Sequence, residues 1–421
     1  MKDYLNKFIS YKALIFAICF ALAKGGVFFA PIILANYIND IDIYGSFEYV
    51  LGVAVLIQVF VNLGFSGAIP YFILKKKEIK FHDFFNRHLF YLLCFAFVTY
   101  ILYIITLSTL IAAVLSAFLF VLHMQFGISF KTNGKSSNGV VVESFFYISI
   151  LLFTLIMMMF DIKFELKYLL TFILLIFVII FLSTLRKINS FNINLPQYYR
   201  VFNFTKDIVI FSSTIVLIYT SQRFFIGYFL SNNDVGIYSV IFRMSAVVIV
   251  FHQFISTALF KKIYESNSKN LDLFFSFTIL IILFSSLLIW GFSSFFSNII
   301  YSSTISEIII ANSDIHLIIL GQILFWVVSA QNENIIAREN LSFLAFKNSV
   351  IIFISVSILF ITYCLFYNLN LTVILMFIAL LMFIVNLSNY YLLHRNYVKL
   401  PFTIFANLFS ILLIISITLI N

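Results

Sequence analysis

The sequence predicts an all-α integral membrane protein, and three observations carry that prediction: composition, the length of the apolar runs, and the placement of basic residues. Of 421 residues, 63% are hydrophobic and 10% are charged, with a mean hydropathy of +1.09. Soluble domains carry about 25% charged and about 45–50% apolar residues. Such a chain cannot cover itself with polar surface in water, so lipid is its main solvent.

Apolar runs of the length that one helix needs to cross a bilayer, about 20 residues, recur from end to end. The expected spans are 12–36, 44–74, 87–107, 109–130, 138–160, 166–185, 207–230, 235–260, 272–300, 314–336, 343–367, 370–393 and 401–420. The first is read as a permanent helix, because it is longer than the apolar region of about 7–15 residues in a signal peptide. Gly25, Gly26 and Pro31 predict that this helix is bent or locally open.

Lysine and arginine set the orientation. With the N-terminus inside, 21 of the 26 basic residues fall on inside segments and their flanks, whereas the outside loops carry Lys163 and Lys167. This asymmetry is the positive-inside pattern of membrane proteins. The net charge of +9 is therefore explained by topology and does not indicate a nucleic-acid partner.

A short internal repeat divides the spans. Residues 42–47 (DIYGSF) and 233–239 (NDVGIYS) each place an acidic turn, a glycine and then an aromatic residue at the start of an even-numbered span. Aligning Gly45 with Gly236 gives an offset of 191 residues (236 − 45). Six spans per half give both halves the same orientation, which predicts two six-helix bundles in a parallel pseudo-two-fold repeat. Chance similarity of two polar turns is the other interpretation.

The expected organisation follows from these boundaries. It comprises an N-terminal six-helix lobe (1–185), a polar cytoplasmic linker (186–206), a C-terminal six-helix lobe (207–393) and an extra transmembrane segment (394–421), which makes twelve core helices and a thirteenth.

Three basic residues fall inside the spans. A charge at mid-membrane costs at least about 2.5–3.5 kcal/mol on insertion scales, so it usually faces a partner or a wet cavity. Lys24 lies twelve residues past Lys12, about 18 Å along a helix, and Arg223 and Arg243 lie in the outer parts of their spans. Either they form structural ion pairs or headgroup contacts, or they line a cationic cavity for an anion such as a diphosphate, which arginine binds with two parallel hydrogen bonds.

Further polar residues in the spans are candidates for cavity or gating roles: Glu48, Gln58, Asn62, Gln253, Glu333 and Arg338. Glu48 is expected near a helix end, where a carboxylate is usually solvated. Gln58 and Asn62 lie one turn apart, a spacing that also suits contacts between helices. Glu333 and Arg338 belong to a polar cluster that is either a gate or a wet helix end.

Catalytic and metal chemistry find no support in the sequence. Three distant cysteines show no metal-site spacing with histidine, and no Gly-rich nucleotide loop with Lys and Ser/Thr is present. We therefore expect a protein that is not an enzyme, holds no cofactor or metal, and draws any transport energy from a gradient.

Three stretches resemble polysaccharide flippases of the Wzx type, relatives of multidrug/toxin extrusion (MATE) antiporters and the peptidoglycan lipid flippase. Residues 24–47, with Gly25-Gly26, Pro31 and 44–47 (YGSF), resemble the opening of that family, and 62–70 (NLGFSGAIP) its second-helix ending. Residues 221–230 (SQRFFIGYFL) and 234–239 (DVGIYS) are similar to its best-preserved stretch. The family usually has Asp before that arginine, whereas this chain has Gln222.

The resemblance implies a MATE-like fold with alternating access in a bacterial inner membrane, N-terminus cytoplasmic. Its implied cargo is an undecaprenyl-diphosphate-linked oligosaccharide, the O-antigen repeat unit, moved to the periplasmic leaflet for lipopolysaccharide biosynthesis. Lys24, Arg223 and Arg243 would then hold the diphosphate or anionic sugars. Coupling to a proton or sodium gradient fits the family, as do partners among membrane lipids, a polysaccharide polymerase and a chain-length regulator.

Two other functions stay open. A drug or cation antiporter of the same fold favours acidic cavity residues, whereas the deep charges here are basic. A membrane O-antigen polymerase needs a sizeable outside loop for chemistry on sugars, and the longest expected here is residues 301–313.

Overall fold

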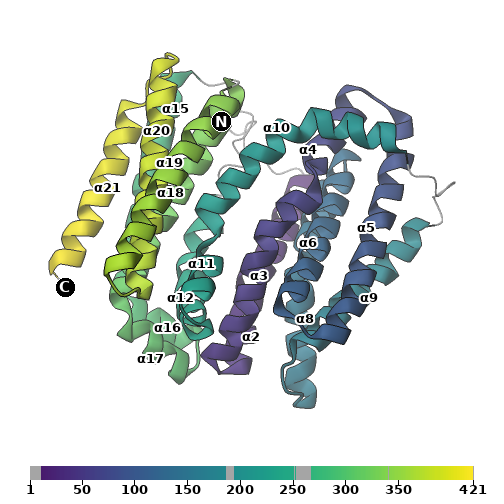
Figure 1. The fold of residues 1–421 in the computed structure, drawn as a ribbon, viewed down its shortest axis with the longest axis horizontal. Helices are drawn as coiled ribbons and strands as arrows, with labels where there is room; N and C mark the ends of the chain where they lie inside the picture. The colour runs from purple at the N-terminus through teal and green to yellow at the C-terminus, as the bar shows by residue number, and fades with distance from the viewer. Residues whose placement is uncertain (1–10, 186–193, 251, 253–266, 340, 421) are drawn as a thin grey trace. The chain divides into compact units, whose positions relative to one another are not determined.

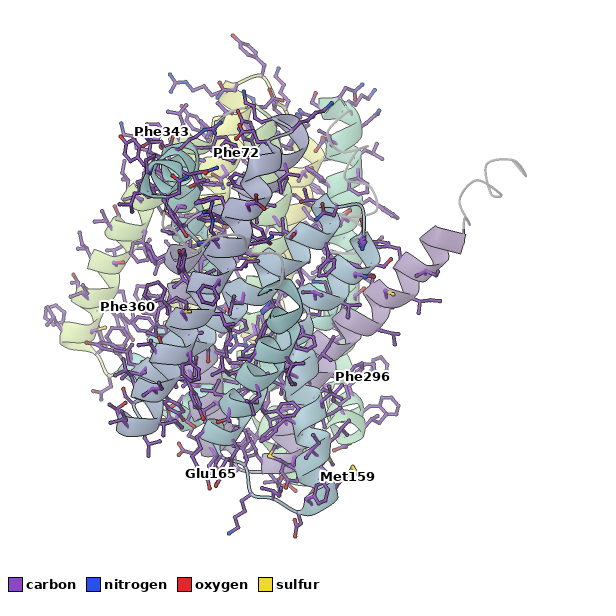
Figure 2. All side chains as sticks on the ribbon, turned by 90° about the vertical axis from the view of Figure 1, so that its right-hand side faces the viewer. Phe72, Met159, Glu165, Phe296, Phe343 and Phe360 are labelled. Atoms are coloured by element: carbon purple, nitrogen blue, oxygen red, sulfur yellow. The ribbon has the colours of Figure 1, made fainter. Side chains whose placement is uncertain are left out.

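The computed structural model describes residues 11–185, 194–250, 252, 267–339 and 341–420, and the regular elements in these ranges are all helical (Figure 1). Within these described ranges, eight helices are long and apolar enough to cross a membrane, or up to ten if each of two bent helix pairs counts as one span. The chain is thus an all-α, multi-pass membrane protein. Large apolar side chains such as Phe343 (67% exposed) and Met159 (79%) project outward (Figure 2), as expected of surfaces that face lipid.

The chain folds into two compact units, of which the first comprises residues 1–38 and 50–213 and the second comprises residues 39–49 and 214–421. The first unit takes its helices from α2 (Tyr11–Ile38), most of α3 (Ile41–Asn62), α4 (Phe65–Pro70), the π-helical turn η1 (Tyr71–Lys75), α5 (Ile79–Thr106), α6 (Thr109–Thr132), α7 (Ser136–Glu143), α8 (Phe145–Phe160), α9 (Leu166–Leu185) and most of α10 (Leu195–Thr220). The second unit holds the start of α3 and the end of α10, together with α11 (Gln222–Phe229), α12 (Asn232–Ser245), α15 (Ser268–Gly291), α16 (Ser293–Ile300), α17 (Ser303–Ala311), α18 (Ser313–Arg338), α19 (Ser342–Phe366), α20 (Leu371–Arg395) and α21 (Pro401–Ile420).

Several elements differ from the expected spans. The span expected over 44–74 begins at Ile41 and breaks after Asn62, because Leu63 and Gly64 have positive φ angles of 49° and 71°. The span over 138–160 is bent by 57° between α7 and α8. Conversely, α2 runs unbroken through Gly25, Gly26 and Pro31, so the helix is not locally open there, and a bend at these residues stays a prediction.

Two expected connections are also partly helical. The polar linker expected over 186–206 is helical from Leu195, where α10 begins, and the loop expected over 301–313 contains α17. Asn194 explains the start of α10, since its side-chain oxygen accepts a hydrogen bond of 3.2 Å from the backbone N–H of Gln197, as helix-capping residues do.

The break in α3 is held by buried polar groups of the first unit. The Asn62 amide donates to Ser66 Oγ (2.6 Å), and its Oδ1 accepts from the fully buried Gln125 of α6 (3.0 Å). Thr205 of α10 donates to the carbonyl of Leu63 (2.9 Å), and its side chain lies where a Cβ on Gly64 would project. A glycine is therefore required at position 64 by both its φ angle and its neighbour.

Candidate functional site

The two glycines of the sequence repeat lie against each other in the second unit, where the first turns of α3 and α12 cross. A Cβ on Gly45 would strike the carbonyl of Asn232 and lie 2.8 Å from the backbone nitrogen of Gly236. A Cβ on Gly236 would strike the carbonyl of Ile41. Asn232 and Ile41 are themselves 191 positions apart (232 − 41), so the contact is reciprocal, as at a two-fold axis.

This crossing brings one carboxylate between two arginines. Glu48, one turn beyond Gly45 on α3, is fully buried. Arg243 of α12 donates to both of its oxygens, from Nη2 at 3.1 Å and 3.2 Å and from Nε at 3.2 Å. The Nε of Arg223, on α11, lies 3.0 Å from Oε2. Tyr44 donates its hydroxyl to Oε1 at 2.7 Å, so Glu48 is the centre of a buried charge cluster.

Aromatic rings enclose the Arg223 side of this Glu48 cluster. The guanidinium of Arg223 lies 5.8 Å from the ring centre of Tyr238 and 5.2 Å from that of Phe242, distances at which a cation is attracted to the ring face. Its Nε also donates to Ser239 Oγ at 3.0 Å. Its Nη2 is buried and has no hydrogen-bond acceptor in the described part of the chain. Among the described residues, two guanidinium groups share one carboxylate, so these three side chains together carry one positive charge in excess.

Two expectations change here. Glu48 is not a solvated carboxylate at a helix end: the first turn of α3 is packed on α12, which removes Glu48 from water. Arg223 and Arg243 are also not open cations, because both contact Glu48. Arg223 follows Gln222 in the sequence, and its carboxylate partner Glu48 comes from a different helix, α3.

Lys24 lies in the first unit, on α2, and has a different environment. The titratable groups in electrostatic range of its ammonium are Glu143, Lys131 and His123, and its Nζ lies 5.9 Å from the centre of the Phe20 ring. Glu143 forms an ion pair with Lys131, at 2.5 Å. Lys24 is thus a half-buried basic residue that no carboxylate in the described residues neutralises through a direct ion pair.

The other candidates are placed separately. Gln58 is half-buried on α3, and Asn62 joins α3 to α6 through Gln125, which is a contact between helices. Glu333 is half-buried on α18 and accepts a hydrogen bond from Ser329. Arg338, at the end of that helix, pairs with Glu339 at 2.8 Å. Gln253 lies outside the described residues.

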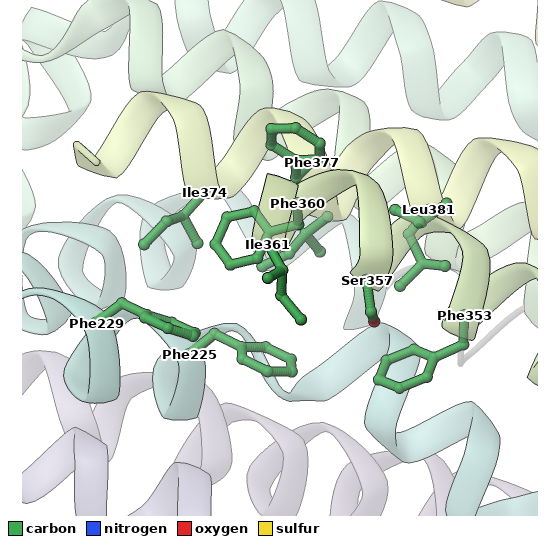
Figure 3. A pocket seen from close by; sticks show the side chains of 11 residues that line it. Phe225, Phe229, Phe353, Ser357, Phe360, Ile361, Ile374, Phe377 and Leu381 are labelled. Carbon is green, nitrogen blue, oxygen red and sulfur yellow. The ribbon is translucent and has the colours of Figure 1, made fainter. Parts of the chain in front are cut away.

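An apolar groove of about 210 Å³ lies between α11, α19 and α20, where Phe225 and Phe229 lie across from side chains of α19 (Figure 3). Five phenylalanines line it, and Ser357 supplies its one hydroxyl. Only 11% of the apolar window of α19 is buried, the lowest share among the eight spanning helices in the described ranges. The groove thus lies beside a helix that faces lipid and suits a hydrocarbon chain. No sequence pattern indicated it, because its residues come from three separated helices.

No family model, curated protein or solved structure matches this chain. The function is therefore inferred from the residues and from their arrangement.

Proposed function

We propose that this chain is a flippase that moves an undecaprenyl-diphosphate-linked oligosaccharide from the cytoplasmic to the periplasmic leaflet of a bacterial inner membrane by alternating access. The observation that carries the proposal is the excess positive charge buried within its helices. The Glu48 cluster has two arginines for one carboxylate, with a free donor on Arg223, and Lys24 lies apart without a direct ion pair in the described residues. Buried cationic donors of this kind suit a diphosphate.

Two further features support the same function. The reciprocal contact of Gly45 and Gly236 is what a parallel repeat of two six-helix lobes produces, and such repeats are a common transporter design. The groove of Figure 3 offers an aromatic, lipid-facing surface for part of a polyprenyl chain. An amphiphilic cargo needs both kinds of surface, one for its phosphates and one for its tail.

The test is surface O-polysaccharide, read as a lipopolysaccharide ladder, in a strain that lacks this gene and is complemented with variants. We expect wild type and Lys163→Ala, a change at an exposed loop lysine, to restore the ladder. Lys24→Ala should insert in the membrane normally but leave lipid-linked repeat units on the inner leaflet. A full ladder in the strain complemented with Lys24→Ala would show that Lys24 is not part of the site.

The same strain separates the alternatives. If the ladder is unchanged in the strain without the gene, the flippase proposal is wrong and the drug or cation antiporter is favoured. The Glu333 carboxylate on α18 would suit a cationic cargo. Lipid-linked units that accumulate on the outer leaflet instead indicate the polymerase.

A matched pair of variants tests the groove. Ser357→Trp fills it, whereas Ile358→Trp adds the same ring at the neighbouring position, which is 58% exposed and does not line the groove. We expect Ser357→Trp to reduce the ladder at least about tenfold, the effect of about 1.4 kcal/mol of lost binding, with Ile358→Trp unchanged. Equal ladders from the two variants remove the groove from the transport cycle.

A further inference from the structure

A second charge cluster lies in the first unit, where one carboxylate again serves two cations. Glu143, the last residue of α7, forms an ion pair of 2.5 Å with Lys131 of α6. The same carboxylate is in electrostatic range of Lys24 on α2. These three side chains are named the Lys24 cluster. Together they carry one positive charge in excess, as the two arginines and the one carboxylate of the Glu48 cluster do.

The packing of α2 places Lys24 beside the end of α7. Ala23 lies in one buried apolar cluster with Val140 of α7. A little further along α2, a Cβ on Gly26 would lie 3.3 Å from the side chain of Ile148, on α8. Lys24 therefore lies between the contacts of α2 with α7 and with α8, at the level where these two helices bend by 57°. The last residue of α7 stands at that bend.

Two glycines hold the carboxylate of Glu143 toward Lys131. A Cβ on Gly127 of α6 would strike Glu143 Cγ, and a Cβ on Gly139 of α7 would strike Lys131 Cγ. Each partner of the ion pair thus crosses the opposite helix at a residue without a side chain. The pair is not sealed from solvent, since its lysine and glutamate side chains are 39% and 23% exposed. Pairs with such exposure contribute little stability, so a change of partner costs Glu143 little.

Neutralisation of Lys131 does not account for this position of Glu143. Because Lys131 is 39% exposed, water hydrates its ammonium and no carboxylate is required there. Lys24 is half-buried and has no direct ion pair in the described residues. Glu143 therefore matters more to the electrostatics of Lys24 than to those of its own partner.

We propose that Glu143 competes with an anionic cargo for Lys24, which weakens the binding of that cargo and promotes its release. The inference rests on the proposed function, which makes a diphosphate the anion at Lys24. A carboxylate and a diphosphate that share one ammonium repel each other, so the carboxylate lowers the affinity of the ammonium for the diphosphate. A site that passes its cargo on needs such a balance, because binding must be strong enough for entry and weak enough for exit.

The experiment measures binding of farnesyl diphosphate, a short prenyl diphosphate, to the purified full chain in nanodiscs by calorimetric titration. We expect Glu143→Gln to bind this probe at least about fivefold more tightly than wild type, the lower end of a typical coupling between two sites. Glu165→Gln, which removes the acid of an exposed ion pair with Lys167, should bind it as wild type does. Farnesol, which lacks the charge, should not distinguish the three proteins.

Further variants separate competition at Lys24 from a general change of charge. In a Lys24→Ala background, Glu143→Gln should no longer tighten binding, because the shared cation is gone. Lys131→Gln should weaken binding, since Glu143 is then free to pair with Lys24. In the complemented strain, Glu143→Gln should give a weaker ladder than wild type, because the cargo is released more slowly.

Each contrary result overturns the proposal. These results are equal affinities of wild type and Glu143→Gln, a gain of equal size in the Lys24→Ala background, tighter binding by Lys131→Gln, and a full ladder from Glu143→Gln in a strain that needs the gene. If Glu143→Gln binds the probe more tightly but the ladder does not require the gene, the competition at Lys24 stands and the flippase fails. A required gene with equal affinities gives the opposite result.

Discussion

Two carboxylates of the second unit have opposite surroundings: Glu48 is fully buried, whereas Glu333 is half-buried. Glu48 accepts hydrogen bonds from Tyr44 and Arg243 and lies 3.0 Å from Arg223 Nε. Glu333 accepts a hydrogen bond from the hydroxyl of Ser329. Both acids lie on helices that cross lipid, where burial of a charge is costly. Glu48 is therefore neutralised by side chains of the protein itself, whereas Glu333 is paired with no cation in the described ranges.

The largest expected effect comes from breaking the complete cluster. Glu48→Gln leaves two guanidinium groups buried without their carboxylate, which should cost about 3–5 kcal/mol of stability. Thermal unfolding and the yield of folded protein measure the loss. The matched control is Glu143→Gln, which breaks the partly exposed pair with Lys131 and should cost far less. Equal losses for the two variants would mean that burial does not govern the Glu48 cluster.

The next largest effect is expected from variants that push apart α12 and α3, the helix that carries Glu48. Gly45→Ala and Gly236→Ala each place a methyl group against the backbone of the opposite helix and should destabilise by about 1–3 kcal/mol. Gly291→Ala is the control, because a Cβ there meets nothing within 4 Å. Unfolding midpoints measure all three variants. Unchanged midpoints for both crossing variants would contradict the close contact of α3 and α12.

The smallest effect is expected for an exposed ion pair of the first unit, because solvent weakens the attraction between its two charges. Arg200 donates to both oxygens of Glu78 at 2.9 Å and 2.6 Å, and these hydrogen bonds hold the pKa of Glu78 below its ordinary value of 4.5. The pair therefore stabilises the fold above that pH and loses its contribution as pH falls through the lowered pKa. Because Arg200 is 52% exposed, the contribution should be less than about 1 kcal/mol.

The measurement for this pair is the difference in unfolding midpoint between wild type and Glu78→Gln at pH 7 and at pH 3. The difference in unfolding midpoint should be small at pH 7 and should disappear at pH 3. A difference of equal size at both values would show that the carboxylate charge of Glu78 contributes nothing.

The membrane class was predictable from sequence because it depends on composition and on the length of apolar runs, and the helical fold of the described residues confirms it. Helix breaks were less predictable. Leu63 and Gly64 interrupt a continuous apolar run with positive φ angles, and the side chain that contacts them, Thr205, is distant in sequence. The number and pairing of the lobes stay predictions.

The candidate site was predictable in part. The cost of burying charge picks out Arg223, Arg243 and Lys24 from sequence alone, since each interrupts an apolar span. Their pairing was not readable, because Glu48 comes from a helix 195 residues before Arg243. The aligned glycines Gly45 and Gly236 did contain this information. If the two glycines are in contact, Glu48 lies one helical turn from the point where their helices cross.

The origin of Glu48 also has a consequence for synthesis. The segment Asn39–Tyr49 belongs to the second unit, yet the ribosome makes it long before residue 214, where the rest of that unit begins. At about 5–20 residues per second, Arg223 emerges roughly 9–35 seconds after Glu48. Until then the carboxyl group must stay neutral or in contact with water. The first helices of this chain therefore stay an incomplete unit during synthesis, because both arginine partners of Glu48 come from the second half.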